Sequence, residues 1–340
     1  MKERDNLFVS RTPYRVSFFG GGTDYTDWFS ENGGSFLSMA INKYCYLQYR
    51  NLPPFFEYKN RIVWSKIEEV DYISDITHPV VRAALELEKI KNVEIHHIGD
   101  LPARSGLGSS SSFAVGMLNV LRYSQGTIAT KKQLALDAIE LERTILMEAG
   151  GIQDQIATAY GGLNYVTIKP SGDFEVSNIH ISVEKKVEFE NSLLLVFTGI
   201  FRNSFEVVDT QIKNMPKSTK QLETISDLTK EACSVFKSDN FIQEFGKLLN
   251  LTWLTKKSLS DKITNPLIDE IYDEAIHAGA YGGKLLGAGA GGFMVFVVPP
   301  NAMDGVKSRL SKLIKVQVRI DEAGAIVNGT ASETYGGKNE

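Results

Sequence analysis

The stretch "LPARSGLGSSSSFA" at residues 101–114 constrains the fold more than any other part of the chain. It follows an alternating segment, "NVEIHHIGD", that predicts a strand, and it leads into an apolar run with helical spacing. Gly106 and Gly108 let backbone N–H groups approach a ligand closely, and a helix that begins near Ser110 adds its unpaired N–H groups. A serine-capped helix after a tight turn is the structural alternative. The stretch therefore predicts a strand, a loop suited to phosphate, and a helix.

Two further segments are dense in glycine, "FFGGGTD" at residues 18–24 and "GGKLLGAGAGG" at residues 282–292. Either one alone is typical of a close-packed turn beside a strand. Three such segments together favour a fold that wraps a ligand with many acceptor oxygens. The serine-rich loop is neither a Walker A loop, because no Gly-Lys-Ser/Thr ends it, nor a GxGxxG turn.

Several charged residues stand next to these segments. Glu142 ends a helical run and Asp154 follows two glycines, while Arg15 and Asp24 flank the first glycine segment. Beside a polyphosphate, one carboxylate can ligate Mg²⁺ and another can accept a hydroxyl proton or orient the attacking oxygen. Any single one of these charges is, on its own, typical of a solvated surface, and we assign Glu148 to that class.

Length and composition narrow the class of protein. The chain has 340 residues, of which 43% are hydrophobic and 23% charged, and this length favours two domains, expected at residues 1–186 and 187–340. The segment "VQVRIDEAGAIV" at residues 316–327 predicts a strand pair that closes the chain. A homodimer is left open.

Charge and hydropathy exclude several partners. A net charge of -4 without a Lys/Arg tract argues against nucleic-acid binding. The N-terminus has no signal-peptide core and no apolar run approaches membrane-spanning length, so we expect a cytoplasmic protein without a membrane partner. The two cysteines, Cys45 and Cys233, have neither disulfide-framework nor metal-site spacing.

Taken in chain order, the glycine-rich segments resemble the three signature motifs of the GHMP kinase superfamily, which includes galactokinase and the homoserine and mevalonate kinases. The matching stretches are "PYRVSFFGGGTDY", "LPARSGLGSSSS" and "GGKLLGAGAGGF", and "GGIQDQIATAYGG" is similar to the segment that holds the catalytic aspartate. The resemblance implies an α+β fold, with an N-terminal ribosomal protein S5-like α/β domain and a C-terminal ferredoxin-like domain. It also implies ATP and Mg²⁺, bound in the cleft between the domains.

The resemblance implies roles for individual residues. Asp154 matches the catalytic carboxylate, which either removes the acceptor proton or stabilises the transition state, and Arg15 is expected beside it. Ser110 and Glu142 match the Mg²⁺ ligands. The nucleotide is expected at Pro102, Ser105, Gly106, Leu107, Gly108, Ser109, Ser110, Ser111, Gly287 and Gly289. The acceptor substrate is expected at Arg15, Gly21, Gly22, Thr23, Asp24, Arg104, Gly151, Asp154 and Arg202.

Within the superfamily, "RTPYRVSFFGGGTDY", "AINKYCYL", "HPVVRAAL" and "FTGIFRNS" look most similar to the bacterial heptose 7-phosphate kinases. Gly21 and Gly22 stand where galactokinases carry Glu-His, which enlarges the site. The resemblance implies phosphorylation of the anomeric O1 of D-glycero-D-manno-heptose 7-phosphate, on the route to GDP-heptose and surface polysaccharide. The cation for the substrate's own phosphate is sought among Arg11, Lys43, Arg82, Arg104 and Arg202.

Two other functions stay open. One is a galactokinase- or fucokinase-like enzyme whose sugar carries no phosphate. The other is a non-catalytic regulator that binds sugar and ATP, although the intact pair of Glu142 and Asp154 argues against it.

Overall fold

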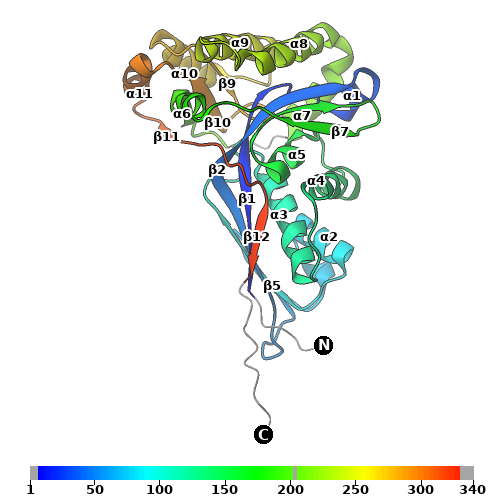
Figure 1. Ribbon diagram of the computed structural model, residues 1–340. Coiled ribbons are helices and arrows are strands. Elements are labelled where there is room, and N and C mark those ends of the chain that lie inside the picture. Colours follow the sequence, from blue (N-terminus) through cyan, green and yellow to red (C-terminus); the bar gives the residue numbers. More distant parts are fainter. Residues whose placement is uncertain (1–6, 202–204, 330–340) are drawn as a thin grey trace.

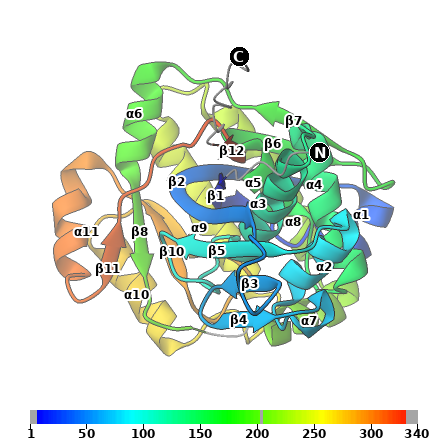
Figure 2. The same cartoon turned by 90° about the horizontal axis from the view of Figure 1, so that it is seen from below.

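The computed structural model describes residues 7–201 and 205–329 of the chain (Figure 1). Two β-sheets, of eight and four strands, are covered by helices, which confirms the predicted α+β class. Seen from below, the helices α2 to α5 (residues 79–160) lie on one side of the strands β1 (Phe8–Phe19) and β2 (Gly34–Asn51). The second sheet lies on the other side with α10 (Pro266–His277) and α11 (Met303–Arg309) (Figure 2). Among the described residues, no helix is both long and apolar enough to cross a lipid bilayer.

The first sheet has the order β12-β1-β2-β5-β3-β4, with β6 and β7 added along the first half of β2. All of its pairs are antiparallel except that of β3 with β5. Its strands are β1 (Phe8–Phe19), β2 (Gly34–Asn51), β3 (Asn60–Val63), β4 (Ile67–Val70), β5 (Val93–Gly99), β6 (Leu163–Ile168), β7 (Phe174–Asn178) and β12 (Ile326–Gly329).

Strand β2 is 18 residues long and pairs with two different strands on one edge. Its first half pairs with β6 from Gly34 to Met39, and its second half pairs with β5 from Cys45 onward. Because β5 ends where the serine-rich loop begins, this pairing places that loop near the middle of β1.

Helix α3 is the central helix of the first half and packs against β1, β2, α2, α4 and α5. Its apolar residues from Phe113 to Leu121 are buried, which agrees with the predicted apolar helix. The helices of this half are α1 (Thr26–Asn32), η1 (Ile73–Asp75), α2 (Pro79–Glu88), α3 (Ser109–Ser124), α4 (Lys131–Ile139), a π-helical turn η2 (Glu140–Ile145), α5 (Gln153–Tyr160) and α6 (Val183–Ser192).

The second sheet is antiparallel with the order β11-β8-β10-β9. Counted along the chain, this is the fourth, first, third and second strand, joined as strand–helices–strand–strand–helix–strand, which is the ferredoxin-like plan. Its strands are β8 (Leu193–Phe197), β9 (Gly282–Leu285), β10 (Phe293–Val297) and β11 (Ile314–Val316). Its helices are α7 (Phe205–Asn214), η3 (Met215–Lys217), α8 (Thr219–Val235), α9 (Phe241–Lys257), α10 (Pro266–His277), η4 (Pro300–Ala302) and α11 (Met303–Arg309).

The two halves share a tightly packed contact. Phe245 of α9 lies edge-on to Phe18 and Phe19 of β1, with ring centroids 5.1 Å apart in both pairs. The buried Lys284 of β9 donates from Nζ to the carbonyl of Phe18 at 2.9 Å. The end of β1 is therefore held by the second half of the chain.

The predicted closing strand pair at residues 316–327 is wrong. β11 pairs with β8 in the second sheet, whereas β12 pairs with β1 in the first, and an isolated bridge joins Ile41 to Ile320 between them. Gly324, at φ +72°, lies between the two strands, but each strand pairs with an edge of a different sheet. A division of the chain at residues 186 and 187 stays a prediction.

Candidate active site

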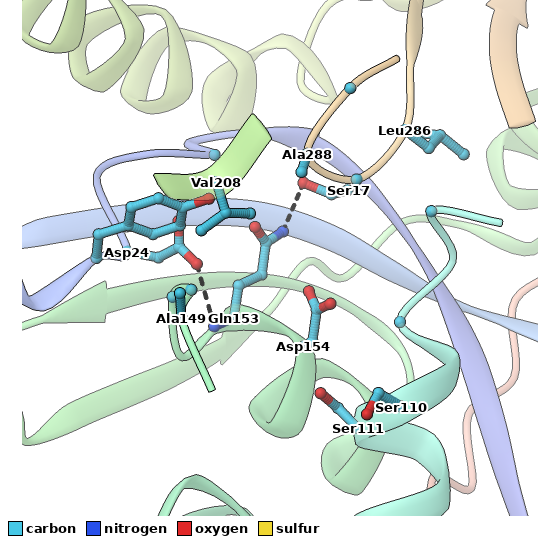
Figure 3. A pocket seen from close by; sticks show the side chains of 18 of the residues that line it. Ser17, Asp24, Ser110, Ser111, Ala149, Gln153, Asp154, Val208, Leu286 and Ala288 are labelled. Atoms are coloured by element: carbon cyan, nitrogen blue, oxygen red, sulfur yellow. Dashed lines mark hydrogen bonds between the residues drawn. The ribbon is translucent and has the colours of Figure 1, made fainter. Parts of the chain in front are cut away.

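A cleft of about 1180 Å³, including space open to solvent, lies where the glycine-rich segments meet. It is lined from β1 and the turn after it, the phosphate loop (residues 102–108), the start of α3, the segment from η2 to α5, α7, the end of α9 and the loop between β9 and β10. Figure 3 shows Asp154 above Ser110 and Ser111 of α3, with Asp24 farther along the same cleft. The three segments thus converge, as their joint occurrence predicts.

The phosphate loop runs directly into α3. Gly108, at φ +71°, is the residue before the helix, and among the described residues no side chain caps the N–H groups of its first turn. Ser109, Ser110 and Ser111 form that turn and line the cleft. Uncapped N–H groups and the positive end of a 16-residue helix make this end of α3 suited to an anion.

Four residues that the sequence assigned to ligand binding do not line the cleft: Pro102, Ser105, Leu107 and Thr23. The Ser105 hydroxyl donates to the carbonyl of Pro102 at 2.6 Å, and the Leu107 side chain is buried in the core. The Thr23 hydroxyl donates to the carbonyl of Ser35 at 2.8 Å. The hydroxyl groups of Ser105 and Thr23 thus bond to backbone carbonyls rather than face the cleft. These residues shape the turns that carry the cleft residues.

The phosphate loop and the loop between β9 and β10 touch through glycines. A Cβ on Gly106 would lie 2.5 Å from the carbonyl oxygen of Leu286, and one on Gly287 would lie 2.7 Å from Cα of Gly106. Both glycines have positive φ, of +80° and +71°. Only glycine allows this approach, so the density of glycine in the two segments follows from their packing as well as from any ligand.

Arg15 and Asp154 form a bidentate ion pair at the centre of the cleft. Nε and Nη2 of the guanidinium each donate to one carboxylate oxygen at 2.7 Å. Nη1 donates to the carbonyl of Gly106, also at 2.7 Å, and the Arg15 side chain is 4% exposed, against 29% for Asp154. Two parallel bonds fix the plane of the carboxylate, which keeps part of its surface open to the cleft.

Asp24 is buried beside the start of α5. Its carboxylate accepts from the N–H of Gly22 at 2.9 Å and of Gln153 at 3.3 Å. Burial raises the pKa of this carboxyl above its usual value, and the charge of Asp154 adds to the rise. A Cβ on Gly151 would lie 1.8 Å from Oδ2 of Asp24, so glycine there is what lets the turn before α5 reach the first glycine segment.

Glu142 lies on the π-helical turn η2 and is 1% exposed. Its Oε2 accepts from the Ser111 hydroxyl at 2.7 Å and from the side-chain amide of Gln155. Among the described residues it has no cationic partner, and no group of three metal-binding side chains occurs there. Mg²⁺ usually takes one or two carboxylates together with phosphate oxygens, so a buried carboxylate that lines the same cleft as Ser110 fits that ion.

The structure also adds cleft residues that the sequence did not single out. Arg143 donates from Nε to the carbonyl of Gly151 at 3.0 Å, which holds the turn before α5. Glu148, expected on the surface, is half-buried and lines the cleft, and burial raises the pKa of its carboxyl. Lys256 enters from α9. Lys256 has no local sequence signal, because it reaches the cleft only through long-range packing. Arg143 and Glu148 instead lie in the chain between Glu142 and Gly151, so their closeness to those two residues is the signal that could have found them.

The candidate cations for the phosphate of the acceptor substrate differ in whether they line the cleft. Arg104 lines the cleft. Arg11 instead contacts Asp321 at 3.7 Å, and Nη1 of Arg82 lies 3.4 Å from a backbone carbonyl of its own segment. Lys43 does not line the cleft, and Arg202 lies outside the described residues. The predicted residues that do line it are Arg15, Gly21, Gly22, Asp24, Arg104, Gly106, Gly108, Ser109, Ser110, Ser111, Glu142, Gly151, Asp154, Gly287 and Gly289.

Comparisons with known proteins agree with this arrangement. A family model for the N-terminal domain of GHMP kinases matches residues 77–162, and one for the C-terminal domain matches residues 230–315. The chain is 30% identical to D-glycero-alpha-D-manno-heptose 7-phosphate kinase of Campylobacter jejuni, over 86% of this chain and 89% of that protein. It is 26% identical to L-fucokinase/L-fucose-1-P guanylyltransferase of Bacteroides fragilis, over 86% of this chain and 35% of that longer protein.

A solved structure shares the fold. The crystal structure of a D-glycero-D-manno-heptose 1-phosphate kinase from Bacteroides thetaiotaomicron has a TM-score of 0.78 to this chain at 23% identity, covering 94% of this chain and 98% of that one. The two family models include the phosphate loop, Asp154 and the loop between β9 and β10. The chain therefore belongs to the GHMP kinase family and is an ATP-dependent kinase.

Proposed function

We propose that this kinase acts on a sugar, and that its substrate is D-glycero-D-manno-heptose 7-phosphate, phosphorylated at the anomeric O1 to give the 1,7-bisphosphate. The relative from C. jejuni supports this substrate, since the similarity spans 86% of this chain. The product is a precursor of GDP-heptose for surface polysaccharide. Such a role implies the cytoplasm, where ATP is available; a homodimer stays a prediction.

One observation carries the proposal. Arg15 joins the phosphate loop, through the carbonyl of Gly106, to the carboxylate of Asp154. The donor side and the acceptor side of a phosphoryl transfer are thereby held at a fixed distance by one buried guanidinium. Positioning of this kind is most of what an enzyme must supply for phosphoryl transfer.

The chemistry assigns a task to each side of the cleft. In the proposed step, the bond between the γ-phosphorus and the bridging oxygen breaks, and its electron pair leaves with ADP. A bond forms between the acceptor oxygen and the phosphorus, and the hydroxyl proton passes to the carboxylate of Asp154. The N–H groups at the start of α3 hold the phosphate oxygens.

Ser110 and Glu142 would hold Mg²⁺ together with the phosphate oxygens of ATP. When bound, Mg²⁺ reduces the negative charge on the β- and γ-phosphate oxygens. Hydrogen bonds from Ser111 and Gln155 orient the carboxylate of Glu142, so this metal-binding group is in place before the nucleotide binds.

The acceptor side of the cleft has room for a long, phosphorylated sugar. A Cβ on Gly21 would meet no atom within 4 Å, so this position is open. Arg104 is an exposed cation on the cleft wall and is our candidate for the phosphate of the acceptor. Asp24 is our candidate for the sugar hydroxyls.

Release of ADP from ATP and Mg²⁺ tests the proposal against a panel of D-glycero-D-manno-heptose 7-phosphate, sedoheptulose 7-phosphate, mannose, galactose and fucose. We expect strong turnover on the aldoheptose phosphate alone. Turnover only on a free sugar would support a galactokinase- or fucokinase-like enzyme, which the similarity to the L-fucokinase of B. fragilis favours as the second candidate. Ligand binding without any product would support a regulator.

A further inference from the structure

Lys256 is a buried lysine at the edge of the cleft that the proposed step does not use. It belongs to the last turn of α9, is 6% exposed, and lines the cleft. Its Nζ donates to the carbonyl of Gly287 at 2.5 Å. Since Gly287 lies against Gly106 of the phosphate loop, this ammonium reaches the place where the two glycine loops meet.

The charges around Lys256 come from four separate elements. Arg15 faces it from β1, Asp24 from the turn before α1, Asp154 from α5 and Lys284 from β9. Burial, and after it the charge of Arg15, lowers the pKa of Lys256 to about 8, while Asp24 and Asp154 act in the opposite sense. The lysine therefore lies among the groups that surround the reacting atoms.

Lys256 has spare hydrogen-bonding capacity. An ammonium carries three N–H donors, and among the described residues the carbonyl of Gly287 is the one hydrogen-bond partner of Nζ, with no carboxylate within ion-pair distance. Burying a cation without a paired anion is unfavourable, so such a group is stabilised when a mobile anion arrives. The anion that enters this cleft under the proposed function is phosphate.

We propose that Lys256 binds the phosphoryl group in transit, donating from Nζ to an oxygen of the γ-phosphoryl group of ATP while the start of α3 holds other phosphate oxygens. This rests on the proposed phosphoryl transfer but not on the identity of the sugar. The first half of the molecule offers neutral N–H groups and hydroxyls to the phosphates. Lys256 adds a full positive charge from the second half, where negative charge develops during transfer.

Nucleotide binding tests this inference without any sugar. We compare wild type with Lys256→Met and Lys256→Arg, and use Lys257→Met as the matched control, since Nζ of Lys257 pairs with Asp269 at 2.6 Å. Calorimetry with the Mg²⁺ complexes of AMP-PNP and ADP should show Lys256→Met binding AMP-PNP about 10- to 100-fold more weakly, the worth of a hydrogen bond to a charged group, with ADP almost unchanged. Lys257→Met should match wild type.

Kinetics with whichever acceptor the wild type phosphorylates give the second readout. We expect Lys256→Met to lower kcat by roughly 100-fold and Lys256→Arg to restore much of it, because a transition-state contact to charge is lost and regained. Since the ammonium of Lys256 loses its proton and its charge above a pKa of about 8, kcat/KM of wild type should fall above that pH. In Lys256→Arg this fall should move to higher pH, because a guanidinium stays charged.

Three results would overturn the inference. Equal weakening of AMP-PNP and ADP in Lys256→Met, with a lowered Tm, would mean that the lysine only supports the Gly287 loop. A raised KM for a phosphorylated sugar, with both nucleotides bound normally, would place the acceptor's phosphate on Lys256 instead. Unchanged binding and turnover would remove Lys256 from the site. If wild type phosphorylates no sugar of the panel, the proposed substrate fails, while the nucleotide comparison still decides the role of Lys256.

Discussion

The two walls of the cleft are built differently. In the wall from the first half, two carboxylates are fixed by other side chains: Arg15 holds Asp154 at 2.7 Å, and Ser111 and Gln155 hold Glu142. The wall from the second half is held through backbone carbonyls, since Lys256 donates to that of Gly287 and Gln211 of α7 donates to that of Ala288 at 2.8 Å.

Because of this difference, we expect substitutions on the two walls to affect different properties of the enzyme. On the first wall, removing one partner leaves a charged or polar group misplaced, so single substitutions should lower the rate of the phosphoryl-transfer step. On the second wall, the contacts depend on how closely the backbone approaches, so substitutions that add volume should act on loop packing and nucleotide affinity. The variants below test that separation.

The largest effect is expected at Asp154. Asp154→Asn keeps the size of the side chain but removes the proton acceptor, and kcat should fall by roughly 10²–10⁴, with nucleotide affinity near that of wild type. The control is Asp304→Asn, which changes an exposed aspartate in the first turn of α11. Turnover of Asp154→Asn within a factor of about three of wild type would remove Asp154 from this role.

Glu142→Gln tests the metal side of the first wall. The amide can still accept from Ser111 and Gln155, but the charge is lost, so the Mg²⁺ concentration for half-maximal rate should rise about 10- to 100-fold. Titration of the rate with Mg²⁺ measures this, and Glu140→Gln on the exposed side of the same turn should behave as wild type. Equal Mg²⁺ dependence in both variants would place the ion elsewhere.

Gly287→Ala tests the second wall. The added Cβ would lie 2.7 Å from Cα of Gly106, at a φ of +71°, so the two loops must separate. Backbone strain of this kind costs about 1–3 kcal/mol, and we expect a lower Tm together with weaker binding of ATP. Gly305→Ala is the control, since its Cβ would have its nearest neighbour at 3.8 Å. Normal ATP binding by Gly287→Ala would show that nucleotide affinity does not depend on the close contact between the two loops.

The smallest effect is expected at Arg104. Arg104→Ala removes an exposed cation, so KM for the heptose 7-phosphate should rise about threefold to tenfold, in line with one screened charge contact. Steady-state kinetics with both substrates varied give the two KM values. A rise in KM for ATP instead would assign Arg104 to the nucleotide.

Much of the site was predictable because its residues lie close in the sequence to the glycine-rich segments. Asp154 lies in the first turn of α5, directly after the turn that contains Gly151, and Gly106 and Gly108 belong to one loop, so local sequence patterns identify them. The turn-forming roles of Thr23 and Ser105 were not predictable, since a hydroxyl facing backbone and one facing a ligand have the same sequence signature.

The rest depends on long-range packing. Lys256 enters the cleft because α9 packs on β9 and against the end of β1, and nothing near it in the chain marks that position. The same holds for the last two strands, which were predicted to pair with each other, whereas each pairs with an edge of a different sheet. Resemblance of motifs identified the α+β class, which does not depend on these contacts.

The most direct test of the account is the position of the new phosphate. The enzyme, ATP, Mg²⁺ and D-glycero-D-manno-heptose 7-phosphate are incubated, and the product is examined by phosphorus NMR. We predict a second sugar phosphorus resonance coupled to the anomeric proton, formed by wild type and almost absent with Asp154→Asn. Inorganic phosphate alone, or a phosphate on any other oxygen of the sugar, would contradict the account.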